Sequence, residues 1–382
     1  MKILHIDVTG PYTEGATYQE NLLPAEMVKL GHQVFIWTSS YEWANGKINY
    51  VGEEKKHMSD GVVLTRMDYV FLFNDFFTNK IRKCKKIYNQ LEELKPDLIM
   101  VHGGQTAIVP EVCKYVKKTP KTRLIADSHV DPLNSARGWM SRHVLHGIIY
   151  RKYIRMLVET ATSFYCISPE AKNYVSKLYG VNKDKLELLP LGGNIIPDDD
   201  YKDNRSMIRS ELGISDSVVN IVHSGKLYEE KRTNDLLDVM DRIVDENVHL
   251  CIIGSAEGEL LTRIENAERK DDRISWLGWK TGEELIKYLC AGDLYVLPGD
   301  VSATVQSAMC CRCGIVVYPY EIYCGMEQDE ICYVKNVDDL KQSLERLIYD
   351  SNLMDRIKTE AFSYAKDKLD YAAQAKQIID GK

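Results

Sequence analysis

The chain has 382 residues, a formal net charge of −7 at pH 7, 45% hydrophobic residues and 27% charged residues. This length suits two domains, and the composition excludes a long disordered chain. The negative charge argues against nucleic acid as a partner. No apolar run approaches the roughly 20 residues of a membrane span, and the N-terminal stretch lacks a signal-peptide pattern. We therefore expect a cytoplasmic protein whose ten cysteines are mostly buried and reduced.

In the first half of the chain, short β-branched runs alternate with longer helical patterns. The strand candidates are residues 2–8, 33–38, 62–67, 98–101, 123–126, 163–167 and 186–189. The intervals are mostly long enough for crossover helices, which predicts βαβ units and a parallel sheet. Ser168 followed by Pro169 indicates the start of one such helix.

A polar break at residues 195–206 contains three consecutive aspartates after Pro197, and we expect a solvated linker there. The alternation then restarts, with strand candidates at residues 220–224, 249–253, 274–276, 294–297 and 314–318. Thr281 and Glu284 have the spacing of a capping box. From residue 338 to its end the chain has a helical pattern.

These patterns predict an α/β protein with two doubly wound, Rossmann-like domains. The first spans residues 1–195 and the second 205–365, and the final helix, 366–382, is expected to pack back on the first domain. Ligands of such sheets bind beyond the carboxyl ends of the strands. The loops that follow the strands are therefore where functional residues are expected.

The segment 224–237 joins a buried strand to a helix that begins near Thr233. Lys226 and Lys231 lie between them, just after Gly225. Two ammonium groups beside a helix start form a site for a pyrophosphate. On spacing alone, both lysines could equally be solvated surface charges.

Five residues of this segment resemble, in order, the pattern of retaining glycosyltransferase family 4: Gly225, Lys226, Leu227, Glu230 and Lys231. The resemblance implies the GT-B architecture, with two domains facing across a cleft, and a donor diphosphate held by Lys226 and Lys231. The sequence departs from the family at Lys226, where arginine is usual, and at Arg232, where glycine is usual. The charge at residue 226 remains, but the bidentate fork of arginine is lost.

The same resemblance assigns further donor contacts in the second domain. Residues 274–285 resemble the strand whose following backbone recognises the nucleobase, which makes Leu277 and Gly278 candidates, although both could be a plain strand end. Residues 297–317 are shorter than the family's glycine-rich turn and lack its two glutamates. Gln306 or Ser307 falls where the second glutamate would be, and Gln306 is either a ribose contact or an ordinary helix residue. Asp300 is the only acid near the position of the first glutamate. The turn residues expected to offer backbone N–H groups are Ser302, Ala303 and Thr304.

In the first domain, residues 9–34 resemble the family's first glycine loop and helix, with Gly15 allowing close approach to the diphosphate. This loop lacks the G-x-G-x-x-G spacing of nicotinamide dehydrogenases.

Histidines follow two strands of the first domain. The Asp127-x-His129-x-Asp131 run resembles the family's histidine-bearing loop near the donor sugar. We expect His129 to contact the sugar at the reacting centre, and Asp127 or Asp131 to orient it or bind the acceptor hydroxyl. His102 is a lesser candidate, and each histidine could instead be a structural hydrogen-bonding group.

The resemblance thus implies a hexosyltransferase-type enzyme that retains anomeric configuration, and we expect it to need no cofactor or metal. Its donor would be a UDP-sugar or GDP-sugar, and fixed positive charge would stabilise the leaving diphosphate. The missing glutamates motivate an alternative, a weak or inactive homologue that binds a sugar nucleotide or a partner. A sugar-nucleotide epimerase is a further alternative.

Residues 132–158 contain no acidic residue but five basic ones: Arg137, Arg142, Arg151, Lys152 and Arg155. Apolar residues are interleaved with them, which suits an anionic membrane surface or a lipid-pyrophosphate acceptor. A helix with one solvated basic face is the plainer interpretation. We expect peripheral contact of residues 137–155 with the inner face of a membrane, and a glycan or lipid-linked acceptor in cell-surface polysaccharide or glycolipid biosynthesis.

Overall fold

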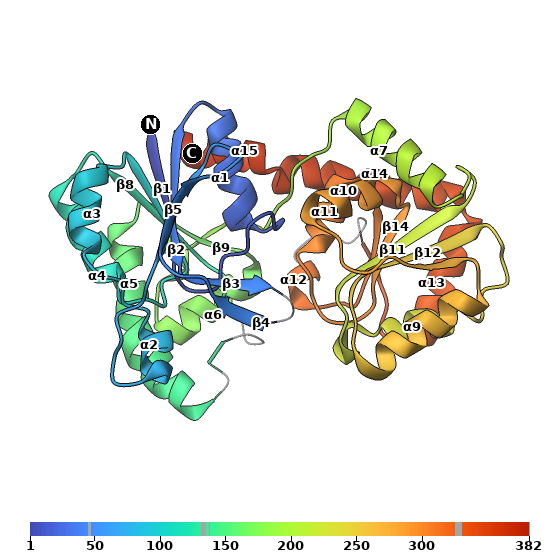
Figure 1. The fold of residues 1–382 in the computed structure, drawn as a ribbon, viewed down its shortest axis with the longest axis horizontal. Helices are drawn as coiled ribbons and strands as arrows, with labels where there is room; N and C mark the ends of the chain where they lie inside the picture. Colours follow the sequence, from blue (N-terminus) through green and yellow to red (C-terminus); the bar gives the residue numbers. More distant parts are fainter. Residues whose placement is uncertain (45–46, 131–134, 137, 325–330, 382) are drawn as a thin grey trace. The chain divides into compact units, whose positions relative to one another are not determined.

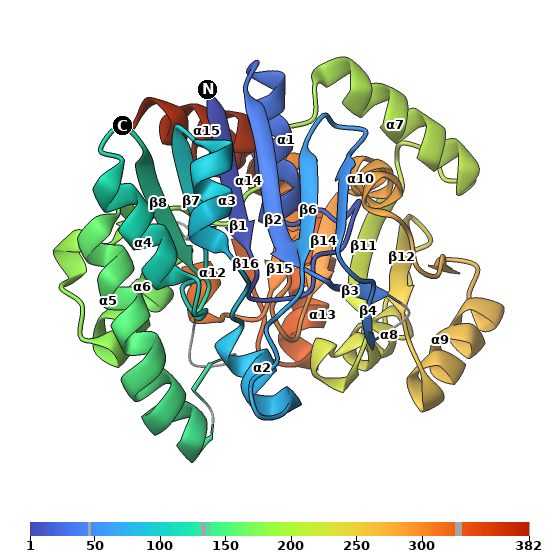
Figure 2. The ribbon, with the colours of Figure 1, turned by 60° about the vertical axis from the view of Figure 1, so that its left-hand side comes forward.

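The computed structural model describes residues 1–382 except 45–46, 131–134, 137, 325–330 and 382. The chain divides into two compact units (Figure 1). Unit 1 comprises residues 1–14, 19–190 and 372–382, and unit 2 comprises residues 15–18 and 191–371. Each unit is an α/β domain with helices on both faces of a mainly parallel sheet (Figures 1 and 2).

The sheet of unit 1 has eight strands in the order β10-β9-β8-β7-β1-β2-β6-β5. All neighbours are parallel except β5 and β6, and β3 and β4 form a separate antiparallel pair. The strands are β1 (Lys2–Asp7), β2 (Gln33–Ser39), β3 (Tyr41–Ala44), β4 (Lys47–Tyr50), β5 (Glu54–His57), β6 (Val63–Met67), β7 (Leu98–His102), β8 (Arg123–Ser128), β9 (Ser163–Cys166) and β10 (Glu187–Leu188).

The helices of unit 1 cover a core built from strand residues such as Leu4, Ile99 and Leu124, none of which has any exposed surface. They are α1 (Gln19–Lys29), α2 (Asp75–Ile81), α3 (Ile87–Leu94), α4 (Val109–Lys118), a π-helical segment (Ser141–Tyr150), α5 (Arg151–Thr160), α6 (Pro169–Tyr179) and a short 3₁₀ turn (Lys183–Lys185). The last helix, α15 (Tyr371–Asp380), lies against this unit because Arg123 donates hydrogen bonds to the carbonyl oxygens of Ile378 and Ile379.

Unit 2 has six parallel strands in the order β13-β12-β11-β14-β15-β16. These are β11 (Val219–Lys226), β12 (Val248–Ser255), β13 (Ile274–Trp276), β14 (Leu294–Leu297), β15 (Gly314–Val317) and β16 (Ile331–Tyr333). Its helices are α7 (Asp198–Glu211), a 3₁₀ turn (Glu229–Lys231), α8 (Thr233–Met240), α9 (Gly258–Lys270), α10 (Gly282–Ala291), α11 (Thr304–Cys310), α12 (Glu321–Cys324), α13 (Val337–Tyr349), α14 (Ser351–Tyr364) and a π-helical turn (Ala365–Leu369).

Local sequence signals account for several helix starts. Ser168 caps α6 by accepting a hydrogen bond from the backbone N–H of Ala171, and Pro169 is the first helical residue. Thr281 and Glu284 form the predicted capping box at α10. Every strand candidate overlaps a strand, and most are continuous apolar runs, which suit strands that are covered on both faces.

The prediction of a solvated linker at residues 195–206 is wrong. Residues 198–211 form α7, whose first turn contains Asp198, Asp199 and Asp200. Carboxylates in the first turn are stabilised by the positive end of the helix dipole, so an acidic run after a proline can begin a helix. Among the described residues, no helix has the length and apolar character needed to cross a bilayer.

Candidate functional site

A cavity of about 290 Å³ in unit 2 gathers most of the residues predicted to bind the donor phosphates. Those that line it are Gly225, Lys226, Lys231, Ser302, Ala303 and Thr304. Residues 16–18 also line it, and Gly15 precedes them in a left-handed conformation with φ +68°. Residues far apart in sequence therefore share one space beyond the ends of β11 and β14.

Two glycines leave the backbone without side chains where β11 and β12 end beside each other. Gly225 pairs with Gly254 in the sheet register, and both have positive φ values, +139° and +151°. A Cβ atom on Gly254 would lie 1.8 Å from the carbonyl oxygen of Gly225. Only glycine fits at residue 254, and the cavity is therefore lined there by bare backbone.

Lys231 is almost fully buried, with 5% of its surface exposed, and it borders the cavity. Its Nζ donates to the carbonyl oxygens of Asp300, at 3.2 Å, and Val301. Since an ammonium group has three donors, one remains for a ligand. Burial lowers the pKa of Lys231 and also that of the half-buried Lys226 at the end of β11.

Arg232 keeps the backbone conformation of the glycine that it replaces. Its φ is +58°, in the left-handed region that favours glycine. The side chain compensates with hydrogen bonds to the carbonyl oxygens of Pro298, at 3.0 Å, and Lys335, at 3.1 Å, and with an ion pair to Asp235. This departure from the family pattern therefore preserves the turn that carries Lys231.

The predicted nucleoside-binding residues lie near this cavity but are absent from its described lining. The carbonyl oxygen of Gly278 accepts a hydrogen bond from the backbone N–H of Gly254. The backbone N–H of Leu277 donates to the carbonyl oxygen of Ile252 in β12. Gln306 is 4% exposed, and its Oε1 has no hydrogen-bond partner within the described part of the chain. Their roles in nucleoside binding stay predictions.

The turn before α11 is partly occupied by its own hydrogen bonds. The backbone N–H of Ser302 donates to the Tyr323 hydroxyl, and that of Thr304 donates to Ser302 Oγ. Asp300 accepts from the hydroxyl of Tyr228. A phosphate bound at this turn would have to replace these protein acceptors.

The sequence interpretation missed several side chains that line this cavity: Tyr18, Tyr228, Trp279 and Lys280. Trp279 is exposed and lies three residues after Trp276, the last residue of β13. A tryptophan in the loop that follows a strand was the available signal.

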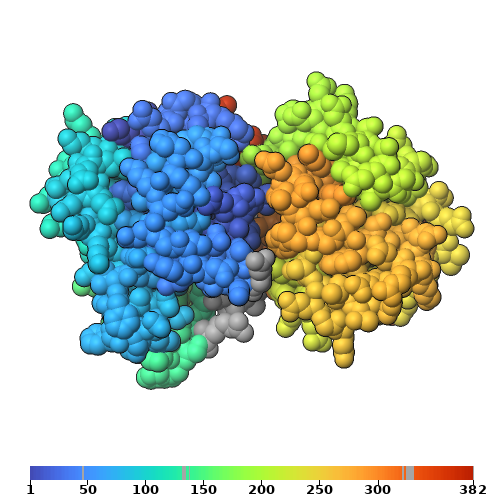
Figure 3. Space-filling view, in the orientation of Figure 1, coloured from blue at the N-terminus to red at the C-terminus, as the bar shows by residue number. Residues whose placement is uncertain are grey.

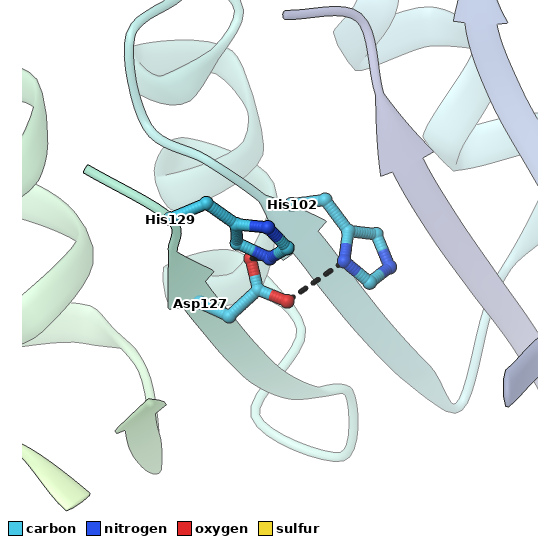
Figure 4. Close-up of side chains that lie close together, drawn as sticks. All are labelled: His102, Asp127 and His129. Atoms are coloured by element: carbon cyan, nitrogen blue, oxygen red, sulfur yellow. Dashed lines mark hydrogen bonds and ion pairs between the residues drawn. The ribbon is translucent and has the colours of Figure 1, made fainter. Parts of the chain in front are cut away.

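A second cavity, of about 600 Å³, lies in unit 1 and is lined by His102 and His129. Asp127, at the end of β8, is buried between these rings (Figure 4). His102 Nδ1 lies 2.8 Å from Asp127 Oδ2, and His129 Nε2 lies 3.4 Å from Asp127 Oδ1. The backbone N–H of Gly103 donates to the same carboxylate at 3.2 Å. His5 continues this series of hydrogen bonds, since its Nδ1 lies 2.9 Å from His102 Nε2.

This arrangement places the rings of His102 and His129 beside the buried carboxylate of Asp127. Burial alone would raise the pKa of Asp127, but the charges of His102 and His129 lower it strongly. Burial disfavours the charged form of His129, yet the Asp127 carboxylate outweighs it and raises the pKa of His129 to about 9. The raised pKa favours the imidazolium form of His129 at neutral pH, in which both ring nitrogens carry a proton and Nε2 faces Asp127 Oδ1.

Two acidic residues that the sequence interpretation missed also line this cavity. Asp7 ends β1, and Glu20 lies in the first turn of α1. Burial raises the pKa of Asp7, and burial together with the charge of Asp7 raises the pKa of Glu20 to about 7. An acid at the end of a strand was the signal for Asp7. The pKa of Glu20 is thus shifted to a value that suits proton exchange near neutral pH.

We expect Glu20→Gln to stabilise the protein at pH 8 but not at pH 4. The pKa of Glu20 is raised on folding, from 4.5 to about 7. Folding therefore favours the protonated carboxyl, and stability is lost as the pH rises through this range. The glutamine side chain stays neutral at both pH values. The free energy of unfolding of the Glu20→Gln variant should therefore exceed that of the native protein at pH 8 by on the order of 1–3 kcal/mol. Urea denaturation at both pH values tests this, and an equal difference at pH 4 and pH 8 would contradict it.

His102, Asp127 and His129 are also the described group that could hold a metal ion, since their ligand atoms lie within 4.8 Å of one another. His102 already contacts Asp127 through one nitrogen and His5 through the other, so a metal would have to displace a hydrogen bond. Asp131, the remaining predicted catalytic residue, lies outside the described residues.

Comparison with known proteins connects both units to sugar transfer. Residues 22–195 match the model of Glycosyltransferase Family 4, and residues 204–364 match that of Glycosyl transferases group 1. A glycogen synthase of Clostridium botulinum (strain Alaska E43 / Type E3) is 21% identical over 282 residues, 65% of this chain and 51% of its own length. The chain thus spans about half the length of this curated relative.

Solved structures share the fold over the whole chain. Sucrose-phosphate synthase from Thermosynechococcus elongatus superposes with a TM-score of 0.69 and 14% identity, covering 100% of this chain and 98% of that one. Anabaena HepE, solved in complex with UDP and glucose, gives a TM-score of 0.65 and 14% identity, with 100% and 99% coverage. The fold is GT-B, and the chain belongs to the glycosyltransferases, with a family 4 domain followed by a group 1 domain.

Proposed function

We propose that this enzyme transfers a sugar, with retention of configuration, from a UDP-sugar or GDP-sugar to a hydroxyl group of a glycan or lipid-linked acceptor. The observation that carries the proposal is the buried ammonium group of Lys231, held beside Lys226 at a cavity lined by the bare backbone of Gly225 and Gly254. Such a site fits a diphosphate, because fixed positive charge stabilises the leaving group. HepE, which shares the fold, was solved with UDP, which supports a nucleotide donor.

Unit 1 supplies the groups that we assign to the sugar and the acceptor. The imidazolium of His129, oriented by Asp127, donates to a hydroxyl group of the donor sugar or to the departing oxygen. Donors that are already positioned when charge develops need no reorganisation during the reaction. Retention of configuration rests on the family resemblance.

We propose further that transfer needs no metal. Lys226 and Lys231 provide positive charge of the kind that a divalent cation would otherwise bring to a diphosphate. Activity that survives EDTA supports this. A requirement for a metal would contradict it and would make His102, Asp127 and His129 the candidate ligands.

The test is calorimetric titration of the full chain with UDP-glucose, UDP-N-acetylglucosamine and GDP-mannose, followed by mass spectrometry of each mixture. We expect one donor to bind and to be hydrolysed slowly, with EDTA present. Binding without hydrolysis or transfer to any offered acceptor would favour the alternative, a sugar-nucleotide binding protein. The absence of glutamate from residues 297–317, where the family has two, is the observation that favours this second function.

The acceptor proposed here belongs to cell-surface polysaccharide or glycolipid biosynthesis, and the basic stretch at residues 137–155 supports contact with a membrane. Part of that stretch has another task, since Arg155 donates to the carbonyl oxygens of Tyr179, at 2.8 Å, and Gly180, at 3.1 Å. The guanidinium groups of Arg151 and Arg155 both border Gly180, at the C-terminal end of α6. Two of the basic residues thus stabilise a helix end, and Arg137 lies outside the described residues.

A further inference from the structure

Four of the seven phenylalanines of the chain lie within residues 71–77, and all four are exposed: Phe71, Phe73, Phe76 and Phe77. Phe73 is the extreme case, with 91% of its surface exposed. None of the other three phenylalanines is exposed. Contiguous exposed aromatic surface of this kind indicates an interaction site, since a scattered single exposure would be ordinary.

The backbone holds these rings outward, two in an ordered turn before α2 and two in the first turn of the helix. Val70 donates its backbone N–H to the carbonyl oxygen of Lys83 at the base of the turn, and Leu72 donates to the buried hydroxyl of Thr78 at 2.8 Å. Asn74 caps α2 by accepting from the N–H of Phe77. Phe73 has φ +57°, a left-handed conformation that bulky residues rarely adopt.

Three of the four rings also contact each other, so they form one surface. The centroids of Phe76 and Phe77 lie 5.5 Å apart in an edge-to-face arrangement, and those of Phe73 and Phe77 lie 6.4 Å apart. The π-helical segment contacts the end of α2. Its Tyr150 hydroxyl donates to the carbonyl oxygen of Lys80 at 2.6 Å.

Positive charge follows the aromatic residues. Between residues 76 and 91 there is no aspartate or glutamate but five basic residues: Lys80, Arg82, Lys83, Lys85 and Lys86. This local excess opposes the net charge of −7 on the whole chain. Aromatic residues beside lysines and arginines fit an anionic bilayer, whose headgroups attract the cations while the rings enter the interface.

We propose that residues 71–86, the α2 patch, dock unit 1 onto the surface of an anionic lipid bilayer. In Figure 3 the residues around α2, in light blue, protrude at the lower edge of this unit. Lys80 and Arg82 of the patch also line the cavity that contains His129. A bilayer bound here lies at one end of that cavity, so the acceptor is a lipid-linked molecule that enters from the membrane; this consequence rests on the proposed function.

Co-sedimentation of the full chain with vesicles tests the patch. We expect binding to vesicles of phosphatidylglycerol and phosphatidylcholine, and much weaker binding to phosphatidylcholine alone. The double variant Phe73→Ser/Phe77→Ser should weaken binding on the order of tenfold to a hundredfold, because two rings no longer enter the interface. Replacing Lys83, Lys85 and Lys86 by glutamine should abolish the preference for anionic vesicles. The matched control, Val244→Ser/Tyr349→Ser, removes two exposed apolar side chains from unit 2 and should bind as the native chain does.

Native-like vesicle binding by the phenylalanine variant would overturn the proposal, as would failure of the native chain to sediment with anionic vesicles. The native chain could also prove to be a dimer that becomes a monomer in the phenylalanine variant, with vesicle binding unchanged. That result would identify the patch as a protein interface and would also overturn the proposal. Donor hydrolysis is measured without vesicles. If the native chain binds vesicles but does not hydrolyse any donor, the proposed function alone is contradicted. If the native chain hydrolyses the donor but does not bind vesicles, the docking surface alone is contradicted.

Discussion

Replacing Lys231 by alanine should weaken donor binding by roughly ten- to a hundredfold, which corresponds to losing one charge-assisted hydrogen bond to a phosphate. The ammonium group is buried, and two backbone carbonyl oxygens already fix its direction. A group oriented before the ligand arrives loses little entropy on binding. Calorimetric titration with the donor found in the screen gives the dissociation constant of each variant.

The stem of Lys231 is buried as well, so the alanine variant could lose packing as well as charge. Lys231→Met keeps an unbranched apolar side chain and removes only the ammonium, and it should show the same loss of affinity with a melting temperature closer to the native value. Lys287→Ala, at an exposed residue of α10, is the matched control and should leave affinity unchanged. A folded Lys231→Met protein with native donor affinity would exclude the phosphate role.

His129→Ala should lower kcat by about a hundredfold or more while changing the donor dissociation constant by less than about threefold. The reason is that the imidazolium acts on charge that develops only during transfer. Asp127 keeps its contacts with His102 and the backbone N–H of Gly103 in this variant, so the fold should persist. Single-turnover kinetics and donor titration, run on the same preparation, separate the two constants.

The control for this variant is His143→Ala, which removes an exposed histidine from the π-helical segment of the same unit. Its kcat should equal that of the native enzyme. If His129→Ala instead retained native turnover, or if donor affinity and kcat fell in parallel, His129 would not be a catalytic residue.

Much of the fold could be predicted from local sequence because apolar runs and capping residues act over a few positions. The parallel strands and the cap at Thr281 followed from such patterns. The polar strands β3, β4 and β5 did not, since edge strands and hairpins lack the continuous apolar run of a buried strand. At α7 the acidic run was compatible with both a linker and a helix start, and only the surrounding structure selected the helix.

The sequence by itself determined the two α/β units, the loop that carries Lys226 and Lys231, and the strand ends that carry His102 and Asp127. Only the tertiary structure decided which charged groups share a buried space. It brought Asp7 and Glu20 to the cavity of His129, and it left Phe73 and Phe77 uncovered. The physical reason is that pKa shifts and exposed surface depend on neighbours contributed by distant segments, whereas strand and helix signals depend on neighbours in the chain.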